Sequence, residues 1–359
     1  MFARKSWTDI LLPVYVIPKT KLRAYIARVL GRRYADLQHA ISNATIKWYD
    51  PKDPKMTKRH WLTVTMHHRL SMHLSIGQFR AVTSSTSDPQ HLLQSCHGLM
   101  AEGAAVESVR TTSRENTKGP DVSKAADQIF NQVSKGNFSG IYVPKIDGST
   151  HILLHVHGGG FVSGSPEVSA AYLLQLNTEL QARGCLVDIF SVRYDLAPES
   201  QFPSAFDQVL AAYEHLSSLG KPIILVGESA GGNLCMALCL FLHRASMDMV
   251  SKGMESCPII AMYLSSPWLN LEDSSEAFQD RHGLDCLDSG ALKRWREAYI
   301  GAGSLNQYSS PLMQLADWER ILPPKVCIIS GEFDLFEPDI SAFAALVKKV
   351  SLRYVRCMT

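Results

Sequence analysis

The chain has 359 residues, 46% of them hydrophobic, and a net charge of +2. That length fits two domains or one large α/β domain with a cap, and the apolar content is enough for one large core. Its basic residues form no cluster interleaved with aromatics in the core region, which excludes nucleic-acid binding. Its eight cysteines show no paired spacing, so the composition predicts neither a metal site nor a cofactor.

Residues 1–33 are basic, with eight Lys or Arg against one acid. Five apolar residues in this stretch fall at helical spacing: Leu22, Tyr25, Ile26, Val29 and Leu30. One interpretation is an amphipathic helix on a membrane surface, and the other is a helix that caps an active site with its apolar face inward. The sequence leaves both open, and it contains no run of about 20 apolar residues that could span a bilayer.

A change of pattern near residue 106 divides the chain into an N-terminal cap or membrane-contact segment, 1–105, and a core, 106–359. The core opens with two predicted antiparallel strands, 106–111 and 137–143, with a short helix or turn at 125–133 between them. After these, apolar strands alternate with helices, which predicts a mostly parallel sheet covered by helices on both faces. The predicted strands are 151–157, 185–192, 222–226, 259–264 and 325–330, and the predicted helices are 170–183, 204–219, 231–245 and 339–349.

A lid-like insertion is predicted at about 270–316, where the strand pattern is interrupted. Within it, Trp295 and Tyr299 are four residues apart on a predicted helix. Residues at this spacing share one helix face. They either form the core of the lid or line an apolar pocket for an acyl chain or sterol.

The first glycine-rich motif is His157-Gly158-Gly159-Gly160-Phe161, directly after a predicted strand. A glycine turn in this place presents backbone N–H groups to a developing oxyanion, and Gly158 and Gly159 are the candidate donors. The motif alone is also compatible with a simple turn or a phosphate loop. The phosphate interpretation is disfavoured because no Lys-Ser or Lys-Thr pair follows.

The second motif is Gly227-Glu228-Ser229-Ala230-Gly231-Gly232-Asn233, about seventy residues later and again directly after a strand. This is the strand–turn–helix setting of a nucleophile elbow, with Ser229 as nucleophile and the Ala230 N–H as a further oxyanion donor. Gly227 and Gly231 flank the serine because the turn is sharp and backbone passes close on both sides. Either motif alone is weak, but the pair in this order is specific.

Between the motifs stands a third block, Tyr194-Asp195-Leu196-Ala197-Pro198-Glu199, followed by Phe202-Pro203 and Asp207. Over about 105–359 the chain resembles the hormone-sensitive lipase-like family of α/β hydrolases, which includes arylacetamide deacetylases and fungal steryl acetyl hydrolases. Asp195 stands where that family usually has Arg, beside the site and not in it.

The resemblance implies the α/β-hydrolase fold, with lid helices from the N-terminal part and from an insertion. It also implies a carboxylic-ester hydrolase acting on a hydrophobic acetyl or short acyl ester of lipid or secondary metabolism. In such a site His157 and Gly160 support the glycine loop. Oligomeric state is not readable from the sequence, and the resemblance leaves open a cytoplasmic location or a peripheral one on an internal (ER) membrane.

A serine nucleophile needs a base, and the base needs an acid, in the chain order Ser, Asp or Glu, His. Asp334 follows the predicted strand 325–330 and matches the family pattern G/A-E-x-D, so it is the predicted acid. Glu332 and Asp339 are weaker candidates. The alternative role for Asp334 is to cap the next helix.

The base is missing from the sequence as printed. The thirteen histidines end at His282, and none follows Asp334. The predicted last strand begins at about 350, and the chain ends at Thr359, near where the family places its histidine. The sequence therefore predicts a chain cut short before its base and impaired as an enzyme. The alternative is a non-catalytic binding protein on the same fold, as in the plant gibberellin receptor, which resembles this family and lacks the histidine.

Overall fold

The computed structural model describes residues 131–143, 145–249, 259–272, 285, 287–314, 317–331, 334–347 and 352–357. The predicted N-terminal segment 1–105, with its basic stretch 1–33, lies outside these residues. So do the predicted strand 106–111 and residues 273–284 of the predicted lid. Those predictions remain untested by the structure.

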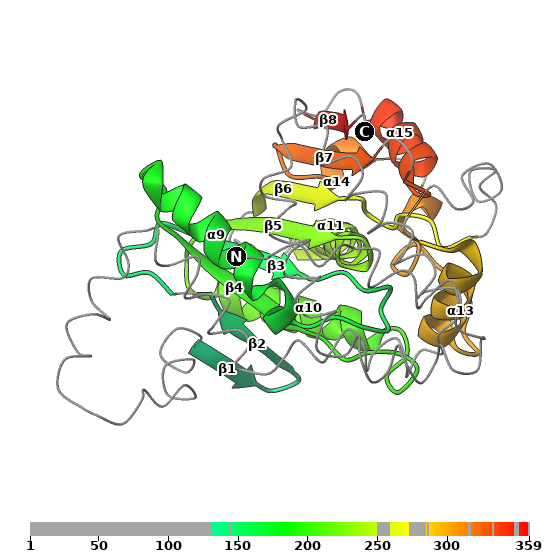
Figure 1. Cartoon of the computed structure of the whole chain (residues 1–359), viewed down its shortest axis with the longest axis horizontal. Coiled ribbons are helices and arrows are strands. Elements are labelled where there is room, and N and C mark those ends of the chain that lie inside the picture. The colour runs from blue at the N-terminus through cyan, green and yellow to red at the C-terminus, as the bar shows by residue number, and fades with distance from the viewer. Residues whose placement is uncertain are drawn as a thin grey trace, which may run out of the picture.

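The core is an eight-stranded sheet in the order β1-β2-β4-β3-β5-β6-β7-β8 (Figure 1). From β4 to β8 all neighbouring strands are parallel, whereas β2 is antiparallel to both β1 and β4. The strands are β1 (Asn131–Lys135), β2 (Phe138–Tyr142), β3 (His151–Val156), β4 (Val187–Arg193), β5 (Ile223–Glu228), β6 (Ile259–Ser265), β7 (Val326–Gly331) and β8 (Leu352–Cys357).

Helices cover both faces of this sheet (Figure 1). The described helices are α9 (Pro166–Ala182), α10 (Ser204–Ser217), α11 (Ala230–Met249), α13 (Ser289–Ile300), the 3-10 turn η4 (Pro311–Met313), α14 (Trp318–Ile321) and α15 (Glu337–Leu346), of which α13 lies beyond the ends of the strands (Figure 1). Alternation along β3 divides the core in two. Ile152 and Leu154 pack into the cluster that holds α10 and α11, while Leu153 packs with Leu173 of α9 on the other face. The predicted parallel sheet covered on both faces is confirmed.

The opening hairpin differs from the prediction. Residues 131–133 belong to strand β1, not to a helix or turn, and β1 pairs with β2 through a two-residue turn at Gly136 and Asn137. Gly136 has φ +56°, which suits a tight hairpin turn. The mostly exposed β1 carries no apolar alternation, so only the Gly-Asn pair signalled the hairpin.

Strand β8 confirms the predicted last strand and lies parallel to β7, with Cys357 opposite Gly331. The carboxyl ends of β3, β5, β7 and β8 therefore meet at one edge of the sheet. The glycine loop follows β3, the serine turn follows β5 and the acid turn follows β7 at this edge. Open α/β sheets bind their ligands at this edge.

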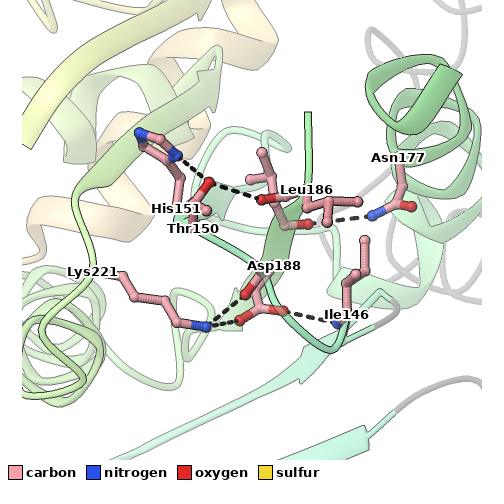
Figure 2. Close-up of polar contacts among 9 residues, drawn as sticks. Ile146, Thr150, His151, Asn177, Leu186, Asp188 and Lys221 are labelled. Atoms are coloured by element: carbon pink, nitrogen blue, oxygen red, sulfur yellow. Dashed lines mark hydrogen bonds and ion pairs between the residues drawn. The ribbon is translucent and has the colours of Figure 1, made fainter. Parts of the chain in front are cut away.

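A buried ion pair fastens the opposite edge of the sheet (Figure 2). Asp188 is 1% exposed and accepts hydrogen bonds from the Ile146 N–H at 2.8 Å and from Lys221 Nζ at 3.0 Å. Lys221 also donates to Ser149 Oγ at 2.6 Å. Burial alone would raise the pKa of Asp188, but hydrogen bonding to Ser149 and Ile146 and the Lys221 ammonium hold it below its usual value. These contacts join the starts of β3, β4 and β5.

Candidate active site

Ser229 occupies the sharp turn between β5 and α11 with φ +50°, a conformation that non-glycine residues rarely adopt. Backbone hydrogen bonds hold it there. Its N–H donates to Ser265 O at 3.0 Å, and its carbonyl accepts from the N–H groups of Asn233 at 3.1 Å and Trp268 at 3.0 Å. Such strain persists only where the surroundings over-determine the backbone, and it is concentrated at functional sites.

The glycines around the serine are required by close backbone contacts. A Cβ on Gly227 would lie 2.7 Å from the Gly231 carbonyl oxygen, and one on Gly231 would lie 2.0 Å from Val156 O. The first turn of α11 therefore packs directly against the ends of β3 and β5. Ala230, at the start of α11, is fully buried.

The glycine loop after β3 lies next to the serine turn. A Cβ on Gly158 would stand 3.4 Å from Ser229 Cβ, although the two residues are far apart in sequence. Gly159 has φ +115°, and its carbonyl accepts hydrogen bonds from the N–H groups of Val162 at 3.1 Å and Ser163 at 3.0 Å. The tertiary structure thus brings the predicted oxyanion donors and the predicted nucleophile together.

His157 supports this loop from beneath. It is 2% exposed, its Nδ1 lies 2.8 Å from Gly158 O, and its ring stacks on Tyr194 with centroids 4.1 Å apart. The Tyr194 hydroxyl donates to His157 O at 2.8 Å. Burial lowers the pKa of His157 to about 4, so the ring is neutral at pH 7 and Nδ1 donates to the Gly158 carbonyl.

Helix α13, part of the predicted lid, packs on the outer side of the glycine loop. The Trp295 ring lies 2.4 Å from where a Cβ on Gly160 would stand, and Tyr299 stacks on Phe161. Both α13 side chains are buried, so in the structure they form packed core and not an open pocket wall. The close approach of Trp295 explains why the third position of the glycine motif carries no side chain.

Asp334 follows β7, and its Oδ1 accepts the Phe336 N–H at 2.9 Å, at the start of α15. This contact closes a turn onto Phe336, the residue at the N-cap of α15 (Glu337–Leu346), and no side chain caps that helix, so the alternative capping role of Asp334 is not borne out. Sequence reasoning missed Asp285, which is 8% exposed and accepts the Leu335 N–H at 2.6 Å. Asp285 belongs to the segment before α13, so it fastens that segment to the acid turn. Glu332 lies outside the described residues.

Neither His155 nor His151 supplies the missing base. His155 is buried within β3 beside Ser191, with Nδ1 at 2.8 Å from Ser191 Oγ, and burial lowers its pKa to about 3. His151 contacts Thr150 at the opposite edge of the sheet (Figure 2). His282 lies outside the described residues. In the described part of the chain, no cluster of His, Cys, Asp and Glu could hold a metal ion.

The alpha/beta hydrolase fold family matches residues 153–357, more than half of the chain. This chain is an alpha/beta hydrolase. Its curated relatives include hormone-sensitive lipases: mouse hormone-sensitive lipase is 31% identical over 209 residues, which is 55% of this chain and 26% of that protein. The acetyl-hydrolase of Streptomyces hygroscopicus is 31% identical over 200 residues, covering 55% of this chain and 60% of the relative.

Solved structures agree on the fold. An esterase from the bacterial hormone-sensitive lipase family has a TM-score of 0.56 at 22% identity, covering 83% of this hydrolase and 86% of that chain. The Francisella virulence factor BioJ has a TM-score of 0.60 at 20% identity, covering 82% and 87%. The hydrolase spans from about a quarter to 60% of the length of the two curated relatives above. Among the helices that the structure describes, none has the length and apolar run to cross a bilayer.

Proposed function

We propose that this hydrolase cleaves a hydrophobic carboxylic ester with an acetyl or short acyl group. The observation that carries the proposal is the contact between the two motifs. A Cβ atom built on Gly158 would lie 3.4 Å from the Cβ atom of Ser229. Relatives named acetyl-hydrolase and versiconal hemiacetal acetate esterase support an acetyl ester.

In this proposal the Ser229 hydroxyl attacks the ester carbonyl. The N–H groups of Gly158, Gly159 and Ala230 stabilise the negative charge that develops on the carbonyl oxygen. The Gly159 carbonyl is held by Val162 and Ser163, so the loop is organised before substrate arrives. Asp334 takes the role of the acid that orients a base.

We further propose that the chain as printed turns over slowly, because no histidine follows Asp334. His157 does not replace it, since its Nδ1 is bonded to Gly158 O and burial lowers its pKa to about 4. Removing the base from a comparable triad costs on the order of a millionfold in kcat. The oxyanion donors and binding alone leave roughly 10³–10⁴-fold over water.

A second function is favoured by the same observation. A protein with this serine turn and glycine loop but no base could bind a small molecule without cleaving it, on the pattern of the gibberellin receptor. The two proposals differ in what happens after binding. An esterase forms an acyl-enzyme at Ser229, whereas a binding protein releases its ligand unchanged.

Hydrolysis of p-nitrophenyl butyrate by the purified chain tests the proposal, with Ser229→Ala as the blank. We expect turnover well below about 1 s⁻¹, the lower end of ordinary enzyme rates. A version extended after Thr359 by the histidine-bearing segment of a relative should recover serine-dependent turnover. Failure of the extended version, together with ligand binding by both versions, would favour the binding protein. A serine-directed organophosphate should label Ser229, and labelling at a different serine would contradict its assignment as nucleophile.

The basic segment 1–33, outside the described residues, is proposed to act as a membrane contact or as part of a lid. Deleting it separates the two roles. A membrane role predicts that the protein moves from the pelleted to the soluble fraction and keeps ligand binding. A lid role predicts loss of ligand binding with unchanged fractionation. If neither property changes, both roles are wrong.

A further inference from the structure

The carboxyl group of Glu228 lies beside the glycine loop, at the end of β5 and directly before the serine. A Cβ built on Gly158 would stand 3.5 Å from Glu228 Cδ and 3.4 Å from Ser229 Cβ. The carboxyl, the proposed nucleophile and a proposed oxyanion donor therefore meet at one point. Neither motif by itself indicated this, because the residue between Gly227 and Ser229 varies freely in a nucleophile elbow pattern.

The charge on this carboxyl is not neutralised within the described part of the chain. No described side chain forms an ion pair or hydrogen bond with Glu228. Arg193 is a cation on β4 whose charge acts on His157. Its guanidinium is already held by Glu167, with Nη1 donating to Oε2 at 3.0 Å and Nη2 donating to Oε1. The Glu228 side chain is exposed to solvent, and the protein around it raises its pKa by desolvation.

We propose that Glu228 makes the site select ligands by charge, accepting neutral acyl esters and repelling acyl groups or products that carry a carboxylate. The inference rests on the proposed oxyanion role of Gly158 and narrows the substrate class to uncharged esters. A carboxylate product formed beside Glu228 is expelled by the same repulsion. At an effective dielectric constant of about 20, the repulsion between two unit charges about 6 Å apart weakens binding of the anion roughly a hundredfold. Solvent reaches Glu228 and screens its charge, so we expect the charge to weaken anion binding only about tenfold.

The pH dependence of ligand binding can be assigned to Glu228, because the titratable groups around it keep their charge over the pH range of the test. Burial raises the pKa of Tyr172 on α9 and of Tyr194 after β4, and Glu228 itself adds to both shifts. Burial lowers the pKa of His157 to about 4. None of these three side chains therefore changes charge between about pH 5 and 8. Because the surrounding protein desolvates the Glu228 carboxyl and raises its pKa, this group ionises at higher pH than an ordinary glutamate although solvent reaches the residue, and the repulsion of anions should grow as pH rises.

The test measures binding in a Ser229→Ala background, in which turnover is absent. Butyrate and its neutral analogue butyramide are titrated by calorimetry from pH 5 to 8, with and without Glu228→Gln. We expect Glu228→Gln to strengthen butyrate binding about tenfold at pH 8, with a smaller gain at pH 5, and to leave butyramide unchanged. Glu214→Gln, on an exposed position of α10, is the matched control and should change neither affinity. Glu228→Ala also removes the charge, so it should strengthen butyrate binding as well.

Three results would overturn the inference. Equal gains for butyrate and butyramide would show that Glu228 acts through shape and not charge. Unchanged butyrate affinity in both Glu228 variants would show that its charge does not reach the ligand. If butyramide and butyrate bound to none of the variants, the proposed function would fail as well, whereas binding without charge discrimination leaves the proposed function standing and removes only the role of Glu228.

Discussion

Tyr299 stacks face to face on Phe161, with ring centroids 3.7 Å apart and planes 3° from parallel. Phe161 itself has φ +64°, so the last residue of the glycine motif is held in a strained backbone conformation. The contact joins α13 to the glycine loop. Helix α13 therefore acts as a fixed support for the loop that presents the proposed oxyanion donors.

Tyr299→Phe and Tyr299→Ala separate the ring from its hydroxyl. The hydroxyl is buried without a hydrogen-bond partner among the described residues, so Tyr299→Phe should be neutral or stabilise the protein by about 1 kcal/mol. Tyr299→Ala removes the stacked ring and should cost about 3–5 kcal/mol of unfolding free energy. Urea unfolding measures both. A large loss in the Phe variant would show that the hydroxyl is bonded after all.

Gly158→Ala and Gly159→Ala should differ sharply. A Cβ on Gly159 would lie 2.2 Å from Ser163 O, at a φ that alanine rarely adopts, so this variant should lose the loop conformation and thermal stability. A Cβ on Gly158 would lie 3.1 Å from Glu228 O, which a small shift can accommodate. We expect Gly158→Ala to fold and to lower serine-dependent turnover.

The measurement for this pair is kcat and KM in the histidine-extended version, beside a thermal unfolding curve. Complete loss of one oxyanion donor lowers kcat about 10²–10³-fold. This is the largest decrease in kcat that we expect when the alanine side chain displaces the Gly158 N–H. A raised KM with unchanged kcat in Gly158→Ala would mean that this N–H binds substrate rather than the transition state.

Stability should fall as the solution becomes acidic, because two buried histidines must stay neutral. Burial lowers the pKa of His155 to about 3 and that of His157 to about 4, below the ordinary value of about 6.5. Between these values the unfolded chain binds more protons than the folded one, so the free energy of unfolding decreases as pH falls from about 6.5.

Each buried histidine should contribute a loss of about 2 kcal/mol by pH 5. The check is urea unfolding at several pH values. His155→Gln should remove about half of the part of the slope of stability against pH that these two histidines contribute, whatever its effect at pH 7. An unchanged slope would show that His155 is not kept neutral by burial.

Lys221→Met should destabilise the protein because it leaves the Asp188 charge buried without its cation. Removing one partner of a buried ion pair costs about 3–5 kcal/mol, and the partial exposure of Lys221 places this case at the lower end. Asp188→Asn in the same chain should recover part of the loss. Additive losses in a double-mutant cycle would show that the two side chains do not interact.

The sequence by itself determined the succession of strands and helices along the chain from β3 to β8, and the positions of the two glycine motifs. These are local properties. An apolar run followed by a glycine turn and a helical pattern predicts a βαβ unit wherever it occurs. The matching family confirms the fold that they predicted. Strand β2 was predicted, but its hairpin partner β1 was missed because an exposed strand carries little apolar alternation, and only the Gly-Asn turn was informative.

The tertiary structure decided which side chains meet at the carboxyl edge of the sheet. Nothing in the spacing of Trp295 shows that its ring lies against Gly160, or that Asp285 accepts the Leu335 N–H. The contact of Glu228 with Gly158 likewise depends on how β3 and β5 lie side by side. Such contacts arise from packing between segments distant in sequence. A local pattern fixes the element that carries a side chain, whereas the neighbours of that side chain are fixed only when the sheet is assembled.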